Sequence, residues 1–98
     1  LADMAIKVEA SRCLVNNTMR RMDAGSLVQK EGSITKTFVT DCAQEVTSNA
    51  VQVFGGYGYS REYPVEKLMR DVKVFQIFEG TNQIQRMTIA NVLNKEYK

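Results

Sequence analysis

The sequence predicts an all-α protein, an antiparallel helical bundle with three long helices and one short helix. Apolar residues recur every three to four positions over most of the chain, which is the period of a helix with one buried face. Most of the glycines and the single proline lie between these periodic stretches. At 98 residues the chain is expected to form one domain.

The first helix is predicted over residues 1–23, and Gly25 is its predicted left-handed cap. The second helix begins between Leu27 and Ser33 and ends at the Gly55-Gly56 pair. The expected inward positions of the first helix are Leu1, Met4 or Ala5, Val8, Ser11 or Arg12, Val15, Met19 and Met22. Those of the second helix are Ile34, Phe38, Cys42, Val46, Ala50 and Phe54.

The third helix is short, and Pro64 is expected at its first position, where a missing N–H group costs nothing. Residues 74–78 are either extended or a helix end. Thr81 or Asn82 caps the last helix. The residues of this helix expected to face inward are Ile84, Met87, Ala90 or Asn91, Val92 or Leu93, and Tyr97.

Composition excludes several classes of function. A net charge of +2 is too small to indicate a nucleic-acid surface, and no apolar run is long enough to span a bilayer. The absence of histidine excludes Ser-His and Cys-His catalytic sets and disfavours a transition-metal site. Cys13 and Cys42 are expected to be buried thiols without a disulfide. A bundle of this length buries little core, so we expect an open face that a missing helix or an oligomer partner covers.

Glu79 is the candidate catalytic residue. It lies on a turn after an apolar run and is followed by Gly80, which would let a ligand approach the backbone closely. Burial beside Phe78 would disfavour the charged carboxylate and suit Glu79 to act as a general base near neutral pH. The alternative is a surface acid near a helix N-terminus.

Two further groups of residues are candidates for ligand contact. Gly55, Gly56 and Gly58 follow a helix rather than a strand, so they do not form a Rossmann fingerprint. They either cap the helix and make a tight turn, or they let the backbone pass close to a cofactor. The polar residues Gln52, Thr81 and Gln83 flank the two turns and are either ligand contacts or solvated side chains.

Three motifs carry a resemblance to a known family. FGGYGY, EYPVEKLMRD and QIFEGTNQIQ occur at residues 54–59, 62–71 and 76–85. At these spacings they closely resemble the C-terminal helical domain of the acyl-CoA dehydrogenases, and the less distinctive residues 1–50 fit the preceding helices of that domain. The resemblance implies an FAD enzyme that removes the α proton and the β hydride of acyl-CoA thioesters.

The resemblance also implies roles for individual residues. Glu79 falls on the catalytic base of the short- and medium-chain branch, and Gly80 lies against the substrate. Thr81 and Gln83 fall on contacts with FAD. The cofactor-binding segment Gln52, Val53, Phe54, Gly55 and Gly56 falls on a stretch that reaches the FAD of a neighbouring subunit. Relatives are usually homotetramers, act in fatty-acid β-oxidation and pass electrons to an electron-transfer flavoprotein.

We expect residues 1–98 to be a fragment that lacks the family's N-terminal helical and middle β domains. Such a fragment is expected to be inactive alone and to bind FAD weakly or not at all. Two alternatives stay open: a helical oligomerisation module without catalysis of its own, and an acyl-CoA oxidase-like relative. The family implies a cytoplasmic location if the source is bacterial and the mitochondrial matrix if it is eukaryotic.

Overall fold

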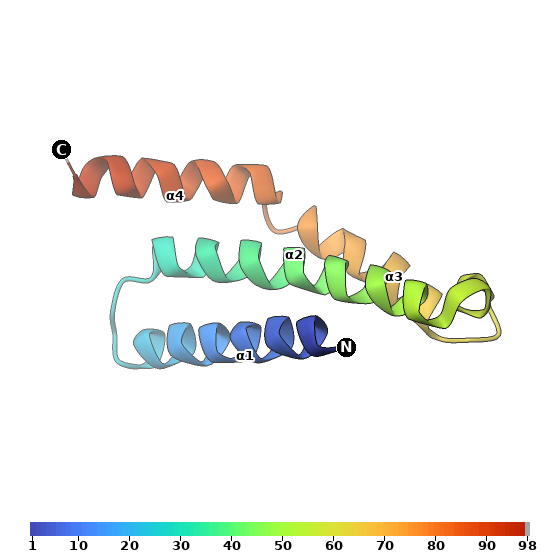
Figure 1. Ribbon diagram of the computed structural model, residues 1–98. Coiled ribbons are helices and arrows are strands. Elements are labelled where there is room, and N and C mark those ends of the chain that lie inside the picture. The colour runs from blue at the N-terminus through green and yellow to red at the C-terminus, as the bar shows by residue number, and fades with distance from the viewer. Residues whose placement is uncertain (98) are drawn as a thin grey trace.

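The computed structural model describes residues 1–97 and confirms the all-α prediction (Figure 1). Within these residues there are four α-helices and two short 3-10 helices. In chain order they are α1 (Ala2–Asp23), α2 (Gln29–Phe54), η1 (Gly55–Tyr59), α3 (Val65–Val72), η2 (Lys73–Gln76) and α4 (Asn82–Glu96).

Helix α2 is the centre of the fold. The main packing partner of α1, α3 and α4 is in each case α2, and η1 and η2 also contact it. Helix α1 runs antiparallel along one side of α2, while α3 and α4 return one after the other along the other side (Figure 1). The molecule is therefore elongated, with extents of 51 × 23 × 20 Å.

The turn between α1 and α2 forms as its sequence predicts. Gly25 has a φ of +82°, a left-handed conformation that glycine adopts without a steric cost. The N–H groups of Gly25 and Ser26 donate to the carbonyls of Met22 and Arg21, each at 3.0 Å, which satisfies acceptors at the end of α1. Helix α2 then begins at Gln29, inside the predicted interval.

The interface between α1 and α2 is more polar than the apolar period predicts. Thr18 is buried, and its hydroxyl shares a hydrogen bond of 2.7 Å with the hydroxyl of Thr35. The predicted inward positions Leu1, Val8, Met19 and Met22 are exposed, and so is Cys13, which was expected to be buried. On α2 the predicted inward positions Phe38 and Phe54 are exposed as well. Helix α1 therefore turns part of its apolar stripe outward, because α2 alone covers only one narrow side of it.

The segment between α2 and α4 differs in detail from the prediction. Gly55 ends α2 with a φ of +64°, but the chain continues directly as η1 rather than as an irregular turn. Pro64 is the cap before α3 and not its first residue, and its carbonyl accepts the first helical hydrogen bond from the Leu68 N–H at 3.2 Å. Residues 73–76 form η2, so of the two alternatives for residues 74–78, extended or a helix end, the structure supports a helix end.

The inward face of α4 was predicted incorrectly. Ile84 and Met87 are 50% and 60% exposed, and Tyr97 is also exposed. Asn82 is instead the most buried residue of the helix, at 3% exposure. Because Asn82 forms hydrogen bonds to α2, it rotates α4 so that the stripe containing Ile84 and Met87 points away from α2.

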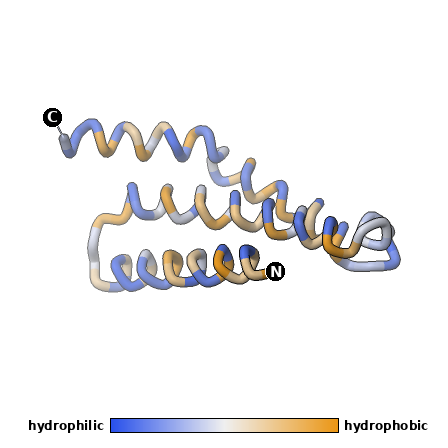
Figure 2. The backbone as a smooth tube through the Cα atoms, viewed as in Figure 1, coloured by the Kyte–Doolittle hydropathy of each residue, from blue (hydrophilic) through white to orange (hydrophobic). Residues whose placement is uncertain are grey.

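The hydrophobic core is thin. Among residues 1–97, Cys42 is the one apolar residue that counts as buried, at 9% exposure. Apolar and polar residues alternate along every helix instead of forming a continuous apolar segment (Figure 2). No helix in the described part of the chain has both the length and the apolar character needed to cross a membrane. Large apolar side chains therefore remain at the surface of α1, α2 and α4, as the expected open face requires.

Candidate functional site

The Glu79-Gly80 turn joins η2 to α4 in an unusual backbone conformation. Glu79 has a φ of +55°, and among the described residues it is the only non-glycine residue with a positive φ. Gly80 follows with a φ of +86°. A side chain with a Cβ atom disfavours the left-handed region, and residues held there cluster at functional sites.

Thr81 ends the turn and starts α4. Its hydroxyl accepts a hydrogen bond from the Ile84 N–H at 3.2 Å, which confirms one of the two predicted caps. Gln83, in the first turn of α4, is exposed. Thr81 and Gln83 therefore lie next to Glu79 and Gly80 along one edge of the molecule.

A partly buried polar network, centred on the buried side chain of Asn82, fixes α4 and η2 to α2. The amide Nδ2 of Asn82 donates to the Thr40 hydroxyl at 2.9 Å and to Asp41 Oδ1 at 2.7 Å. Gln76 Nε2 donates to the same Asp41 oxygen at 2.8 Å, and Arg86 Nη2 donates to Asp41 Oδ2 at 2.7 Å. Asp41 thus accepts hydrogen bonds from three side chains that belong to two other elements.

The environment of Asp41 sets its protonation. Burial alone raises the pKa of this carboxyl, but the hydrogen bonds from Gln76, Arg86 and Asn82 act in the opposite direction and outweigh it. The resulting pKa lies below the ordinary value of 3.8. Asp41 is therefore ionised at neutral pH and holds the network together.

The structure does not bury Glu79, contrary to the expectation from its apolar neighbours. Its side chain is exposed, and Phe78 beside it is also exposed, at 45%. The turn lies at the margin of a thin molecule, and no further layer among the described residues covers it. Within residues 1–97, the backbone N–H of Glu79 also has no hydrogen-bond acceptor.

The Gly55-Gly56 segment lies far from the Glu79 turn. The network anchors the turn near Asp41. At a helical rise of about 1.5 Å per residue, Asp41 and Gly55 are about 20 Å apart along α2. Gln52, Val53, Phe54, Gly55 and Gly56 are all exposed. One chain therefore does not bring its two groups of predicted ligand-binding residues into a single pocket.

The glycines of this segment differ in whether packing within the chain leaves room for a side chain. A Cβ atom on Gly58 would lie 2.5 Å from the Val51 carbonyl oxygen, so packing within the chain requires glycine there. A Cβ atom on Gly55 or Gly56 would meet nothing within 4 Å. The space beside Gly55 and Gly56 is open to a group from outside the chain.

Two hollows have different relations to the predicted site. One of about 320 Å³ lies beside the Glu79 turn and is lined by Asp41, Lys73, Gln76, Ile77, Thr81, Asn82, Gln83 and Arg86. The sequence analysis identified Thr81 and Gln83 but missed Asp41 and Arg86. No local motif marks those two residues, because Asp41 meets the turn only through the packing of α2 against α4.

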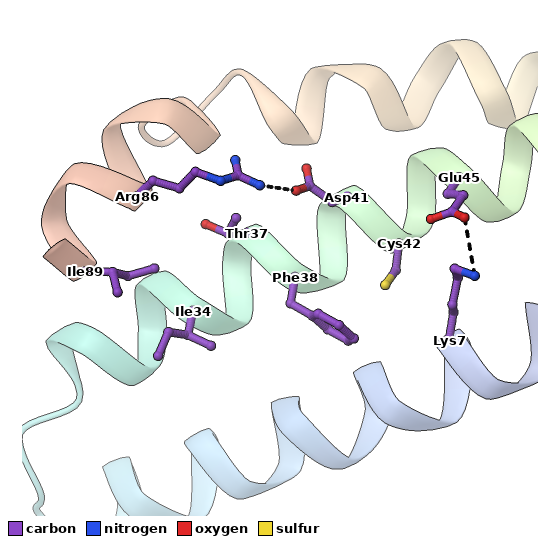
Figure 3. Close-up of a pocket in the computed structure, with 9 residues that line it drawn as sticks. All are labelled: Lys7, Ile34, Thr37, Phe38, Asp41, Cys42, Glu45, Arg86 and Ile89. Atoms are coloured by element: carbon purple, nitrogen blue, oxygen red, sulfur yellow. Dashed lines mark hydrogen bonds and ion pairs between the residues drawn. The ribbon is translucent and has the colours of Figure 1, made fainter.

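A second hollow, a groove of about 480 Å³, runs over α2 between α1 and α4 (Figure 3). Apolar side chains, among them Ile34, Phe38 and Ile89, line it together with Cys42. An ion pair stands at each side, Lys7 with Glu45 at 3.3 Å and Arg86 with Asp41 at 2.7 Å (Figure 3). None of the predicted site residues lines this groove.

Comparison with known proteins identifies the family. The family model described as "Acyl-CoA dehydrogenase, C-terminal domain" matches residues 1–94. The chain belongs to the acyl-CoA dehydrogenase family. Its fold is that of the C-terminal domain, which confirms the resemblance seen in the three sequence motifs.

The similarity to individual acyl-CoA dehydrogenases and related proteins is high over nearly the whole chain. The chain is 49% identical to the cyclohexane-1-carbonyl-CoA dehydrogenase of Geobacter metallireducens over 98% of its length, and 45% identical over 98% to the caffeyl-CoA reductase-Etf complex subunit CarC of Acetobacterium woodii. It superimposes on butyryl-CoA dehydrogenase from Megasphaera elsdenii with a TM-score of 0.92 and 45% identity over 95% of its length. These matches span 25%, 25% and 24% of the respective relatives.

Acyl-CoA dehydrogenases use FAD, and two exposed parts of this chain fit contact with such a group. The backbone at Gly55 and Gly56 is open to close approach. Thr81 and Gln83 place a hydroxyl and an amide beside the hollow at the turn. Within residues 1–97 the chain does not enclose either of these parts.

Proposed function

We propose that this chain is the C-terminal helical domain of an FAD-dependent acyl-CoA dehydrogenase in which Glu79 is the catalytic base. The observation that carries the proposal is the family match over residues 1–94. The role of Glu79 rests on the resemblance of its motif, QIFEGTNQIQ, to the one that carries the base in the short- and medium-chain branch. The left-handed conformation at Glu79 supports the assignment, because unfavourable backbone conformations persist mainly where function requires them.

Glu79 performs the proton transfer in this proposal. Its carboxylate removes the proton from the α carbon of the acyl thioester, and the electron pair of that C–H bond forms the α,β double bond. The hydrogen on the β carbon leaves with its electron pair, and FAD, when bound, supplies the hydride acceptor. Gly80, which has no side chain, leaves room for the acyl group beside the base.

The backbone of the turn also contributes. The Glu79 N–H has no acceptor within the described residues, so it is free to donate to the thioester carbonyl oxygen. A donor aimed at this oxygen stabilises the negative charge that develops as the α proton leaves. The hydrogen bond thereby polarises the thioester carbonyl group, which is bonded to the α carbon that Glu79 deprotonates.

The exposure of Glu79 is consistent with a site that further polypeptide completes. The chain spans about a quarter of the length of the relatives that it matches, and most of a flavin site must come from outside residues 1–97. Exclusion of water from the turn would strengthen the electrostatic interactions there. We assign that covering role to the remainder of the dehydrogenase.

The two groups of cofactor residues fit two different FAD molecules. Thr81 and Gln83 lie beside Glu79 and are assigned to the FAD of the same active site. Residues 52–56 lie about 20 Å away along α2 and are assigned to the FAD of a neighbouring subunit. This division explains why one chain does not bring the two groups together.

Partner proteins follow from the same assignment. We assign the exposed apolar stripes on α1 and α4 to contacts within a homotetramer of the longer protein. An electron-transfer flavoprotein is the proposed electron acceptor, in line with the relative named as a subunit of a caffeyl-CoA reductase-Etf complex. The proposed pathway is β-oxidation of straight-chain acyl-CoA substrates.

The deciding experiment replaces Glu79 by Gln in the full-length flavoprotein that carries this chain. Loss of a general base lowers the rate by about 100-fold or more, so we expect kcat with acyl-CoA and a dye acceptor to fall by at least that factor. The FAD content should stay at the wild-type level, because the substitution keeps the shape of the side chain. Turnover that is unchanged by Glu79→Gln would remove Glu79 from the mechanism.

The same assay tests the alternatives. Wild-type protein without FAD and without activity toward any acyl-CoA would support an oligomerisation module. Rapid turnover with oxygen in place of the dye would identify an oxidase-like relative.

A further inference from the structure

We propose that Lys36 and Gln85 are positioning residues that hold the Glu79-Gly80 turn in its left-handed conformation. This inference rests on the proposed role of Glu79 as the base. Neither residue touches the reacting atoms in this account. They act by binding the two carbonyl oxygens of the turn from two different helices.

Lys36 binds the turn from α2. Its ammonium group donates to the Gly80 carbonyl oxygen at 2.9 Å and to Asn82 Oδ1 at 2.6 Å. Asn82 is 3% exposed and is itself held by Thr40 and Asp41. The Lys36 ammonium therefore has a fixed position, set by a buried amide, from which it reaches the backbone of the turn.

Gln85 binds the turn from α4. Its Nε2 donates to the Glu79 carbonyl oxygen at 3.0 Å and lies 3.4 Å from the Gly80 carbonyl oxygen. A Cβ atom on Gly80 would lie 2.8 Å from this same Nε2, so Gln85 occupies the space that a larger residue at position 80 would need. The φ of +86° favours glycine at position 80, and a Cβ atom there would displace the flexible Gln85 amide from its contact with the turn.

These contacts explain how an unfavourable backbone conformation is maintained. A left-handed φ at Glu79 is disfavoured because its Cβ atom lies too close to the backbone. Donors on both carbonyls favour this conformation over the alternatives, in which the carbonyls would turn away from them. Within the described residues the Glu79 N–H has no acceptor, so the conformation that these contacts favour leaves it available to a ligand.

Lys30 offers a matched control for Lys36. It also lies in α2 and also contacts α4, through an ion pair with Glu96 at 2.8 Å. It has no contact with the turn. A substitution of Lys30 therefore reports the effect of weakening the α2–α4 contact without loosening Glu79.

The experiment compares Lys36→Met with Lys30→Met in the full-length flavoprotein. We expect Lys36→Met to lower kcat by about 10- to 100-fold, because small displacements of a reacting group cost that much. KM for acyl-CoA, FAD content and Tm should match those of Lys30→Met, which should keep wild-type kcat. Lys36→Arg retains a donor and should restore part of kcat. Hydrogen exchange of the peptide that contains residues 77–81 should accelerate in Lys36→Met only.

Three outcomes would overturn the inference. The first is wild-type kcat in Lys36→Met, and the second is a loss of kcat that occurs only together with loss of FAD. If Lys36→Met does not fold, Gln85→Met removes the second donor and leaves the hydrogen bonds of Asn82 and Asp41 in place. The third outcome is an unchanged kcat in Gln85→Met. Glu79→Gln is measured in parallel. If Glu79→Gln stays active, the proposed function fails. If Glu79→Gln has a low kcat but the Lys36 and Gln85 variants are fully active, only the positioning role is refuted.

Discussion

At the scale of single residues, Glu79 combines three features that rarely occur together. Its backbone is left-handed, its N–H has no acceptor within the described residues, and its carboxylate is exposed. Glycine or asparagine is the usual residue in such a conformation, and residues held there against a steric cost cluster at functional sites. The three features together fit the proposed role of Glu79 at a ligand site that the described residues do not enclose.

Asp41 leads to a prediction about pH. Its pKa in the folded protein lies below the ordinary value of 3.8, so the folded state holds the ionised form more strongly than the unfolded state does. Its contribution to stability is therefore present above the unfolded pKa and is lost as the pH falls through the lower folded pKa. The urea midpoint should fall as the pH is lowered below about 4, and Asp41→Asn should reduce this dependence.

The measurement is a series of urea denaturation curves for wild type and Asp41→Asn across the acidic range. At neutral pH the variant should be less stable, because Arg86 and Gln76 lose a charged acceptor. An identical decline of the two proteins with falling pH would show that Asp41 is not the group responsible.

At the scale of elements, α2 determines where the two candidate regions lie. Its 26 residues carry the Lys36–Asp41 section that anchors the turn, and its C-terminal end leads directly into the Gly55-Gly56 pair of η1. Because one helix joins these sections, its length sets the distance between them. The separation of the two proposed FAD contacts is thus a property of a single helix.

The neighbouring glycines Gly56 and Gly58 give a prediction for the end of α2. Gly58→Ala should lower the free energy of unfolding by about 1–3 kcal/mol, because the new Cβ atom would clash with the Val51 carbonyl and Phe54. Gly56→Ala should change it by no more than about 0.5 kcal/mol, since nothing lies within 4 Å.

Denaturation curves and flavin content of the full-length protein provide the two readouts for this pair. If residues 52–56 contact FAD, Gly56→Ala should lower FAD retention even though it leaves folding intact. Equal stability losses in both variants would contradict the assignment of Gly58 to packing and Gly56 to ligand approach.

At the scale of the whole molecule, the elongated shape and the thin core determine what the chain can do alone. A molecule 51 × 23 × 20 Å with one buried apolar residue among those described has little interior in which to hold a ligand. The exposed apolar stripes on α1 and α4 favour association with other polypeptide surfaces.

We therefore expect the isolated 98-residue chain to bind FAD weakly or not at all and to lack dehydrogenase activity. It should also self-associate, because its exposed apolar side chains remain uncovered. Visible absorbance after purification with added FAD tests the first expectation, and sedimentation tests the second. A retained flavin band would show that residues 1–98 hold more of the cofactor site than the structure indicates.

The sequence by itself determined the helices, most of their ends and the family. These depend on local information: the apolar period, the glycines at positions 25 and 55, the Thr81 cap and three motifs within residues 54–85. Only the tertiary structure decided which side of α4 faces inward, how the turn is held and that Glu79 is exposed. The reason is that Lys36, Asp41 and Asn82 meet across a helix interface, and the contacts of a side chain there depend on the packing of distant segments rather than on neighbouring residues.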